Sequence, residues 1–217
     1  PKNSDHEPTD TKKNFDLRSY TIRAFNLEKR ELVLDFLLHG DSGPASKWAS
    51  SAQIGDSIEI AGPGPAILAA DAADWYLFVG DMTALPAIAV NLEKLSPESK
   101  GIALLEINSS EDKQDLNKPE GVEVNWIINS DPLTGCEDLI KALSCVEIKG
   151  VNPFAWVAGE FELLRFARKL LKYDKAFPKD SLYLSCYWKI GADDPGMKKA
   201  KAALILFDSI KNLFSFK

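Results

Sequence analysis

The chain has 217 residues, with 26 basic against 32 acidic side chains and a net charge of −6. This length allows a sizeable core and one large or two small domains, while the acidic balance argues against nucleic acid as a partner. Three cysteines without C-x-x-C spacing, and no run of about 18 apolar residues, argue against a disulfide framework, a bound metal or a membrane span, so we expect a cytoplasmic protein.

The first third of the chain reads as β-structure. Residues 1–14 are polar and predict a surface loop, and strand-like runs follow over residues 17–25, 31–39 and 57–60. In ELVLDFLLHG every second residue is apolar, which is typical of a half-buried barrel strand. The turn GDSGPASKWA then puts Pro44 at the first position of a short helix, where backbone N–H groups can bind an anion.

Three side chains of RSYTIR suggest a ligand. Arg18, Tyr20 and Thr21 supply a cation, an aromatic ring and a hydroxyl, which together with the helix start could hold the ring system and phosphates of a flavin. Each feature also has a plainer interpretation, because R-x-Y-T is common on strand surfaces and Gly-Pro-Ala-Ser is often only a turn. His39, at the end of the second strand, is equally open to a structural role.

The segment AGPGPA marks the exit from the barrel, residues 69–74 are predicted to be a linker, and the pattern changes near residue 71. Apolar strands WYLFVG, KGIALLEI, VEVNWII, FAWVAG and SLYLSCYW now alternate with helical patterns over residues 83–95, 136–144 and 160–173. This alternation predicts a parallel sheet that is covered on both faces.

Ligands of open parallel sheets bind outside the carboxyl ends of the strands, so the turns at those ends are candidate sites. In VGDMTALP we expect Asp81 to cap the next helix and Thr83 to face the crevice, and WVAGEFE makes a second such turn. Helix capping alone would explain both turns. Neither contains G-x-G-x-x-G, so a tightly gripped dinucleotide pyrophosphate is not indicated.

The blocks RSYTIR, DFLLHGDSGPASKWA, GDMTALPA, WVAGE and CYWKIG follow one another in a characteristic order and spacing. On these blocks, residues 17–191 resemble the siderophore-interacting protein family, the ferric-siderophore reductases of the ferredoxin-reductase-like group. The resemblance implies a flavin-binding antiparallel β-barrel over residues 1–70, whose first strands would precede this sequence, and an α/β domain over residues 71–191. The spacing of apolar residues further predicts an amphipathic helix over residues 192–217. Family members read GDETALP, so Met82 departs from the pattern and the role of that acidic side chain is open here.

The resemblance also implies FAD as cofactor, a ferric siderophore as substrate and NAD(P)H or ferredoxin as electron donor, in a protein that we expect to be a monomer. Two lysines, Lys47 and Lys189, would face an anionic siderophore. No catalytic side chain is implied because the flavin carries the redox chemistry. Cofactor contacts are implied for Arg18, Tyr20, Thr21, His39, Ala45, Ser46, Thr83 and Trp188.

Two other functions stay open at this point. The same scaffold could serve a general flavin-dependent oxidoreductase with another acceptor, or a flavin-free module that only binds an iron chelate. Residues 189–217 contain six lysines against three acidic residues, a local excess of positive charge that would suit docking of an acidic protein such as ferredoxin.

Overall fold

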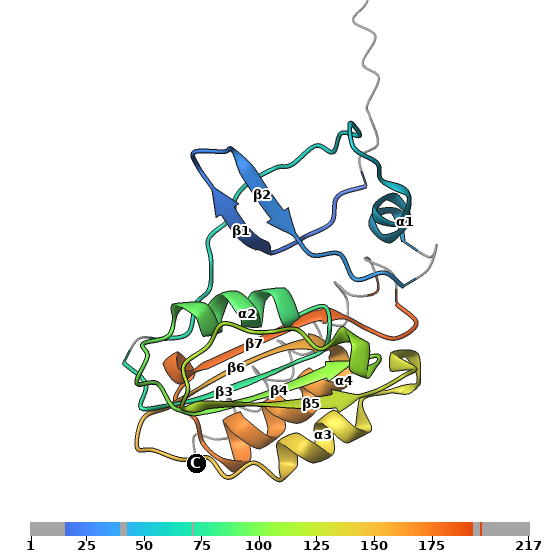
Figure 1. Ribbon diagram of the computed structural model, residues 1–217. Coiled ribbons are helices and arrows are strands. Elements are labelled where there is room, and N and C mark those ends of the chain that lie inside the picture. Colours follow the sequence, from blue (N-terminus) through green and yellow to red (C-terminus); the bar gives the residue numbers. More distant parts are fainter. Residues whose placement is uncertain (1–15, 40–42, 71, 193–195, 197–217) are drawn as a thin grey trace, which may run out of the picture.

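A five-stranded parallel sheet organises the second half of the chain in the computed structural model, which describes residues 16–39, 43–70, 72–192 and 196 (Figure 1). The strands run in the order β5-β4-β3-β6-β7, and every neighbouring pair is parallel. The order reverses between β3 and β6, so their carboxyl ends form the switch point where such sheets bind ligands. The strands are β3 (Trp75–Gly80), β4 (Gly101–Ile107), β5 (Val122–Ile128), β6 (Pro153–Glu160) and β7 (Leu182–Trp188).

Helices cover both faces of this sheet, as predicted from the alternating pattern. Helix α2 (Leu85–Lys94) lies on one face, and α3 (Glu137–Ser144) and α4 (Phe161–Ala167) lie on the other (Figure 1). All six residues of β3 are buried because it is the central strand of the sheet. Phe78 packs in the cluster that includes α2, whereas Leu77 and Val79 pack in the cluster with α3 and α4.

The helix boundaries differ from the prediction in two places. The helix expected over residues 83–95 begins only at Leu85, because Met82 and Thr83 form a turn closed by Asp81. The helix expected over residues 160–173 is α4 followed by a π-helical segment, η3 (Arg168–Asp174). Three short 3₁₀ turns complete the description of this part: η1 (Ser110–Asp112), η2 (Pro132–Thr134) and η4 (Lys179–Ser181).

The first part of the chain forms a two-stranded antiparallel sheet and one helix. Strand β1 (Ile22–Asn26) pairs with β2 (Glu31–Leu34), and α1 (Pro44–Ser51) follows. Both strands are shorter than predicted, and residues 57–60 are not a strand. A strand needs a paired neighbour, and among the described residues only β1 and β2 pair in this part of the chain. Leu38 and Ile60 are therefore exposed, at 54% and 57%, whereas Leu34 and Phe36 are half-buried as expected.

An ion pair connects this first part to α2. Nη2 of Arg23, in β1, lies 2.5 Å from Oε1 of Glu93, in α2. Nε of Arg23 lies 4.0 Å from Oδ2 of Asp35. The chain that leads into the sheet is also tied to α2, since the backbone N–H of Ala69 donates to Asn91 Oδ1 at 2.7 Å. The domain limits near residues 70 and 191 remain predictions. The predicted amphipathic helix over residues 192–217 lies outside the described residues except at positions 192 and 196.

Candidate functional site

The start of α1 lies against His39. The backbone N–H of His39 donates to Ser46 Oγ at 3.1 Å, and Ser46 is buried. Gly43 occupies the N-cap position without a side-chain hydrogen bond, and a Cβ atom there would lie 3.0 Å from His39 Cε1. An uncapped first turn, with Ala45 at its second position, suits a phosphate group that accepts backbone hydrogen bonds. The structure thus brings His39 and Ser46 together at the start of α1, next to Ala45, while their role as cofactor contacts stays a prediction.

Tyr20 belongs to a row of three aromatic rings beside α1. Its ring centroid lies 4.5 Å from that of Phe36, which lies 5.7 Å from Trp48. Tyr20 is still 41% exposed, so part of its surface remains open to a planar ligand. Burial raises the pKa of its hydroxyl, and the Arg18 guanidinium opposes that shift. The positive charge of Arg18 therefore acts on the Tyr20 hydroxyl.

The remaining predicted residues of this part are less constrained. Thr21 is half-buried and immediately precedes β1, while Arg18 is exposed and donates to the carbonyl of Leu17 at 2.9 Å. Lys47 is exposed, and its backbone N–H donates to Gly43 O at 3.0 Å within α1. Among the described residues, no ion pair of the Lys47 ammonium group was found.

A second group of predicted residues meets at Asp81, directly after β3. One carboxylate oxygen accepts hydrogen bonds from the backbone N–H and the hydroxyl of Thr83, the former at 2.9 Å. The other accepts from Trp188 Nε1 at 2.8 Å and from the backbone N–H of Glu160 at 2.9 Å. Asp81 therefore links the ends of β3, β6 and β7. Burial raises the pKa of this carboxyl, and these hydrogen bonds oppose the shift.

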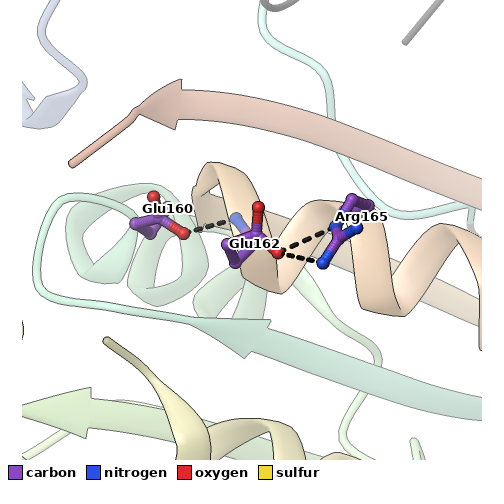
Figure 2. A network of polar contacts seen from close by, with 3 residues as sticks. All are labelled: Glu160, Glu162 and Arg165. Carbon is purple, nitrogen blue, oxygen red and sulfur yellow. Dashed lines mark hydrogen bonds and ion pairs between the residues drawn. The ribbon is translucent and has the colours of Figure 1, made fainter. Parts of the chain in front are cut away.

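Glu160 makes a parallel set of bonds at the end of β6. It caps α4 by accepting from the backbone N–H of Glu162, and its other oxygen accepts from the backbone N–H of Ile190 at 3.2 Å. Figure 2 shows Glu160 at the start of α4, followed by Glu162 and its ion pair with Arg165, whose Nη2 atom lies 2.6 Å from the Glu162 carboxylate. Arg165 pairs with Glu162 and not with Glu160. The buried Glu160 carboxylate is therefore held by the backbone N–H groups of Glu162 and Ile190.

Glu106 is a third buried carboxyl at this edge, and it is the last but one residue of β4. Its Oε2 atom has no hydrogen-bond partner among the described residues. Burial raises its pKa to about 7. A hydrogen bond with the Asn129 side chain lowers this pKa, whereas the negative charges of Asp81 and of the acidic start of α3 raise it further. The thiol of Cys136, at the N-cap of α3, has its pKa raised to about 12 by burial and by the same acidic neighbours. The carboxyl edge of the sheet is thus acidic and shielded from water.

Trp188 and Lys189 leave β7 at this edge. The Trp188 indole is fixed on Asp81, and Lys189 Nζ lies 4.3 Å from the centroid of the Phe161 ring, a cation–π contact. Thr83 and Trp188, predicted separately, therefore share one carboxylate. The predicted residues form two groups, one around α1 and one at the carboxyl edge of the sheet, and no hydrogen bond or ion pair between the two groups was found in the described residues.

The sequence did not predict all contacts of the three buried carboxyl groups, Asp81, Glu160 and Glu106. Asp81 was expected to cap α2, but Ala84 holds that position and Asp81 instead bonds to two other strand ends. Glu160 caps α4 as expected, yet its bond to Ile190 was not foreseen. Glu106 was missed, although a single acidic residue at the end of the apolar run GIALLEI was a usable signal.

Neither a metal site nor a membrane-spanning helix was found in the described residues. No group of three or more His, Cys, Asp or Glu side chains in the described part of the chain is arranged to hold a metal ion. Within the same residues, no helix is both long and apolar enough to cross a membrane. The candidate site is therefore defined by the phosphate-compatible helix start, the aromatic row and the acidic sheet edge.

Comparison with known proteins links both halves of the chain to one family. Residues 2–67 match the sequence profile of the siderophore-interacting FAD-binding domain, and residues 73–191 match that of the siderophore-interacting protein. Ferric vibriobactin reductase ViuB of Vibrio cholerae is 35% identical over 179 residues, which are 82% of this chain and 66% of ViuB. The NADPH-dependent ferric-chelate reductase of Escherichia coli is 26% identical over 174 residues, 79% of this chain and 65% of that protein.

Solved structures confirm the predicted fold class. The siderophore-interacting protein SipS from Aeromonas hydrophila matches with a TM-score of 0.77 and 34% identity, over 87% of this chain and 74% of SipS. The siderophore-interacting protein from Acinetobacter baumannii matches with a TM-score of 0.76 and 25% identity, over 88% and 77% of the two chains. The chain spans about two thirds of the length of the curated relatives given above.

Proposed function

The chain belongs to the siderophore-interacting protein family, and from this membership we propose that it reduces ferric siderophores with FAD and so releases ferrous iron. The observation that carries the proposal is the match of residues 2–67 to the FAD-binding domain, combined with the uncapped helix start and the aromatic row in those residues. When bound, FAD accepts electrons from a donor and passes them one at a time to ferric iron. The chain's own residues supply binding, placement and electrostatics.

On the cofactor side, the residues around α1 would hold the charged part of FAD. The N–H groups of Ala45 and Ser46 would bind the pyrophosphate at the start of α1, and Arg18 would neutralise phosphate charge. Tyr20 would lie along the flavin ring, and the Thr21 hydroxyl would donate near its hydride-accepting nitrogen. The geometry of the helix start, with Ser46 fixed to the backbone of His39, supports this assignment.

At the carboxyl edge of the sheet, Trp188 and Thr83 would face the flavin ring. Their shared carboxylate partner, Asp81, supports a common role because it holds both side chains in one place. His39 would contact the cofactor from the opposite side, next to α1. These positions are proposals, and variants at each of them should change flavin occupancy or its absorption spectrum.

On the substrate side, Lys47 and Lys189 would attract an anionic ferric chelate. Lysine provides a point charge without the bidentate fork of arginine, so recognition would depend on charge and weaken with salt. Iron release needs no protein ligand, because hard oxygen chelators hold ferric iron more tightly than ferrous iron.

For the electron donor we propose NAD(P)H, with ferredoxin as the other candidate. The name of the Escherichia coli relative, an NADPH-dependent ferric-chelate reductase, favours NADPH. The lysine-rich stretch over residues 189–217 is the feature that favours ferredoxin. We further propose a monomer in the cytoplasm, where the three free cysteines would stay reduced.

The test is an anaerobic iron-transfer assay on purified protein loaded with FAD. With NADPH, NADH or reduced ferredoxin, the protein should convert a ferric siderophore to ferrous iron, which a ferrous-specific chelator captures as a coloured complex. A general flavin oxidoreductase would oxidise the donor without preference for ferric chelates. Protein that binds a chelate but retains no FAD, judged by the visible flavin absorption, would overturn the proposal.

A further inference from the structure

Two buried carboxylates from different strands hold the segment that follows β7. Asp81 accepts a hydrogen bond from Trp188 Nε1 at 2.8 Å, and Glu160 accepts one from the backbone N–H of Ile190 at 3.2 Å. Both carboxylates are at least nine-tenths buried. Lys189 lies between the two anchored residues, so its backbone is fixed on either side.

Asp81 reaches across one strand to make this contact. Neighbouring strands lie about 4.8 Å apart, so β7 lies roughly 10 Å from β3, with β6 between them. Gly159 of β6 leaves the space that the carboxylate occupies, because a Cβ atom there would lie 2.4 Å from Asp81 Oδ2. The glycine also has a φ of +144°, which an L side chain rarely adopts. Strand β6 is therefore shaped to let Asp81 contact β7.

The four hydrogen bonds of Asp81 fill its capacity as an acceptor. An ionised carboxylate has about four lone-pair sites, and here the donors are two groups of Thr83, one of Glu160 and one of Trp188. No Lys or Arg of the described residues forms an ion pair with Asp81. The carboxylate is thus satisfied by four neutral donors. An amide side chain has only one acceptor oxygen, so it could not accept hydrogen bonds from all four donors at once.

The same anchoring fixes where the charge of Lys189 lies. Its ammonium group sits 4.3 Å from the centre of the Phe161 ring, and Phe161 is the first residue of α4, directly after Glu160. A lysine side chain normally loses substantial rotamer entropy when it is held in one place. Here the backbone anchors and the ring reduce that freedom before any ligand arrives, which favours binding of a negatively charged group.

We propose that Asp81 is a positioning residue that, together with Glu160, holds Lys189 ready for the anionic ferric chelate. The inference rests on the proposed function for the identity of the chelate, but the anchoring itself can be tested without it. Asp81 acts through Trp188 and Lys189 and does not touch the substrate. It thereby determines preference for charged over neutral chelates.

The chain offers a matched control at the other end of β3. Asp74 also accepts backbone hydrogen bonds, from Val151 at 2.7 Å and from Asn152 at 3.0 Å, and Gly150 leaves space for it. It bridges the start of β3 to the segment before β6, at the amino edge of the sheet, away from Lys189. Asp74→Asn thus removes a comparable carboxylate without disturbing the anchored segment.

The functional measurement compares an anionic ferric tris-catecholate with a neutral ferric trihydroxamate, using the FAD-loaded protein. Asp81→Asn should raise KM for the catecholate about tenfold, the effect of one charge-assisted hydrogen bond, and change that for the hydroxamate by less than about twofold. Trp188→Phe, which removes the indole donor to Asp81, should change the ratio of the two KM values in the same direction. Asp74→Asn should leave this ratio unchanged.

A double-mutant cycle tests whether Asp81 acts through Lys189. Lys189→Gln alone should abolish the preference for the catecholate, and adding Asp81→Asn to it should then have no further effect on the KM ratio. Additive effects of the two changes would overturn the positioning role. An unchanged ratio in Asp81→Asn, in a folded and active protein, would overturn it as well.

A measurement that needs no chelate separates this proposal from the proposed function. Amide hydrogen exchange of the peptide covering residues 186–191, and acetylation of the Lys189 amine, should both be faster in Asp81→Asn and Trp188→Phe than in Asp74→Asn. If both rates match those of the parent protein, the anchoring is wrong, whatever the enzyme reduces. If they rise while the parent reduces no ferric chelate with any donor, the anchoring stands and the proposed function fails.

Discussion

Asp74 and Asp81 lie at opposite ends of β3, and each accepts backbone hydrogen bonds at the matching end of β6, Asp74 from Val151 just before the strand and Asp81 from its last residue, Glu160. Each is accommodated by a glycine in that neighbouring chain, Gly150 for Asp74 and Gly159 for Asp81. The two differ in environment, since Asp74 is exposed and Asp81 is buried. The amino-edge pair therefore contributes only to the fold, whereas the carboxyl-edge pair also lies in the candidate site.

We expect Asp74→Asn to destabilise the protein at neutral pH but not at low pH. Hydrogen bonds from Val151 and Asn152 lower the pKa of the Asp74 carboxyl. A lowered folded-state pKa adds stability above the unfolded pKa of about 4, and this is lost as pH falls through the folded value. Thermal unfolding from pH 7 to pH 2 should show a lower Tm for the variant that converges with the parent in acid. The exposed Asp115→Asn serves as control, and equal Tm values at pH 7 would contradict the assignment.

Gly159→Ala should be among the most destabilising single changes in the sheet. The residue has a φ of +144°, and an added Cβ would lie 2.4 Å from Asp81 Oδ2. Backbone strain of about 1–2 kcal/mol and displacement of a buried carboxylate together predict a loss of about 3 kcal/mol or more in the free energy of unfolding. Chemical denaturation measures this loss.

Gly191→Ala is the matched control for that change. Gly191 also has a positive φ, of +71°, but a Cβ there would meet nothing within 4 Å. It should therefore show only the strain, about 1–2 kcal/mol. Losses of the same size in both variants would mean that Asp81 does not need the space at Gly159.

The sequence predicted the α/β part of the fold well because the inner strands of its sheet are buried on both faces. WYLFVG and FAWVAG are continuous apolar runs, and both are found as central strands. It predicted the first part less well, because ELVLDFLLHG has a period-2 pattern that does not by itself show which strands pair. Residues 57–60 have the composition of a strand, yet no partner strand was found for them in the described residues.

In the candidate site, the sequence predicted the helix start but not the network of contacts around Asp81. The helix start at Gly43 and Pro44 follows from local preferences, and the structure has it as expected. The contact of Asp81 with Trp188 joins residues 107 positions apart, and it depends on the strand order and on Gly159. Sequence periodicity shows neither the strand order nor the space left by Gly159. From the sequence alone, Asp81 was therefore predicted to be an ordinary helix cap.

Arg18→Ala should weaken FAD binding if that guanidinium neutralises cofactor phosphate. A charge-assisted hydrogen bond contributes about 1.5–3 kcal/mol, so the Kd for FAD should rise about tenfold to a hundredfold. Titration of the flavin-free protein, followed by flavin fluorescence, measures this change. Lys29→Ala, in the turn between β1 and β2, removes a positive charge from the hairpin that follows Arg18 and should leave Kd unchanged. A similar Kd for Arg18→Ala and the parent would remove Arg18 from the cofactor site.

Glu106→Gln should stabilise the protein above neutral pH and have little effect in acid. Burial raises the pKa of Glu106 from 4.5 to about 7, so the folded state holds this proton more tightly than the unfolded state. Stability must then fall as pH rises from about 4.5 to about 7, where the carboxyl loses its proton in a site with no partner for Oε2. Glutamine keeps the shape of the neutral acid, so at pH 8 the variant should gain about 1–3 kcal/mol over the parent. Thermal and urea unfolding at pH 4.5 and pH 8 measure the difference, with Glu123→Gln, an exposed position on β5, as control. A gain of equal size at both pH values would show that Glu106 is not the group that titrates.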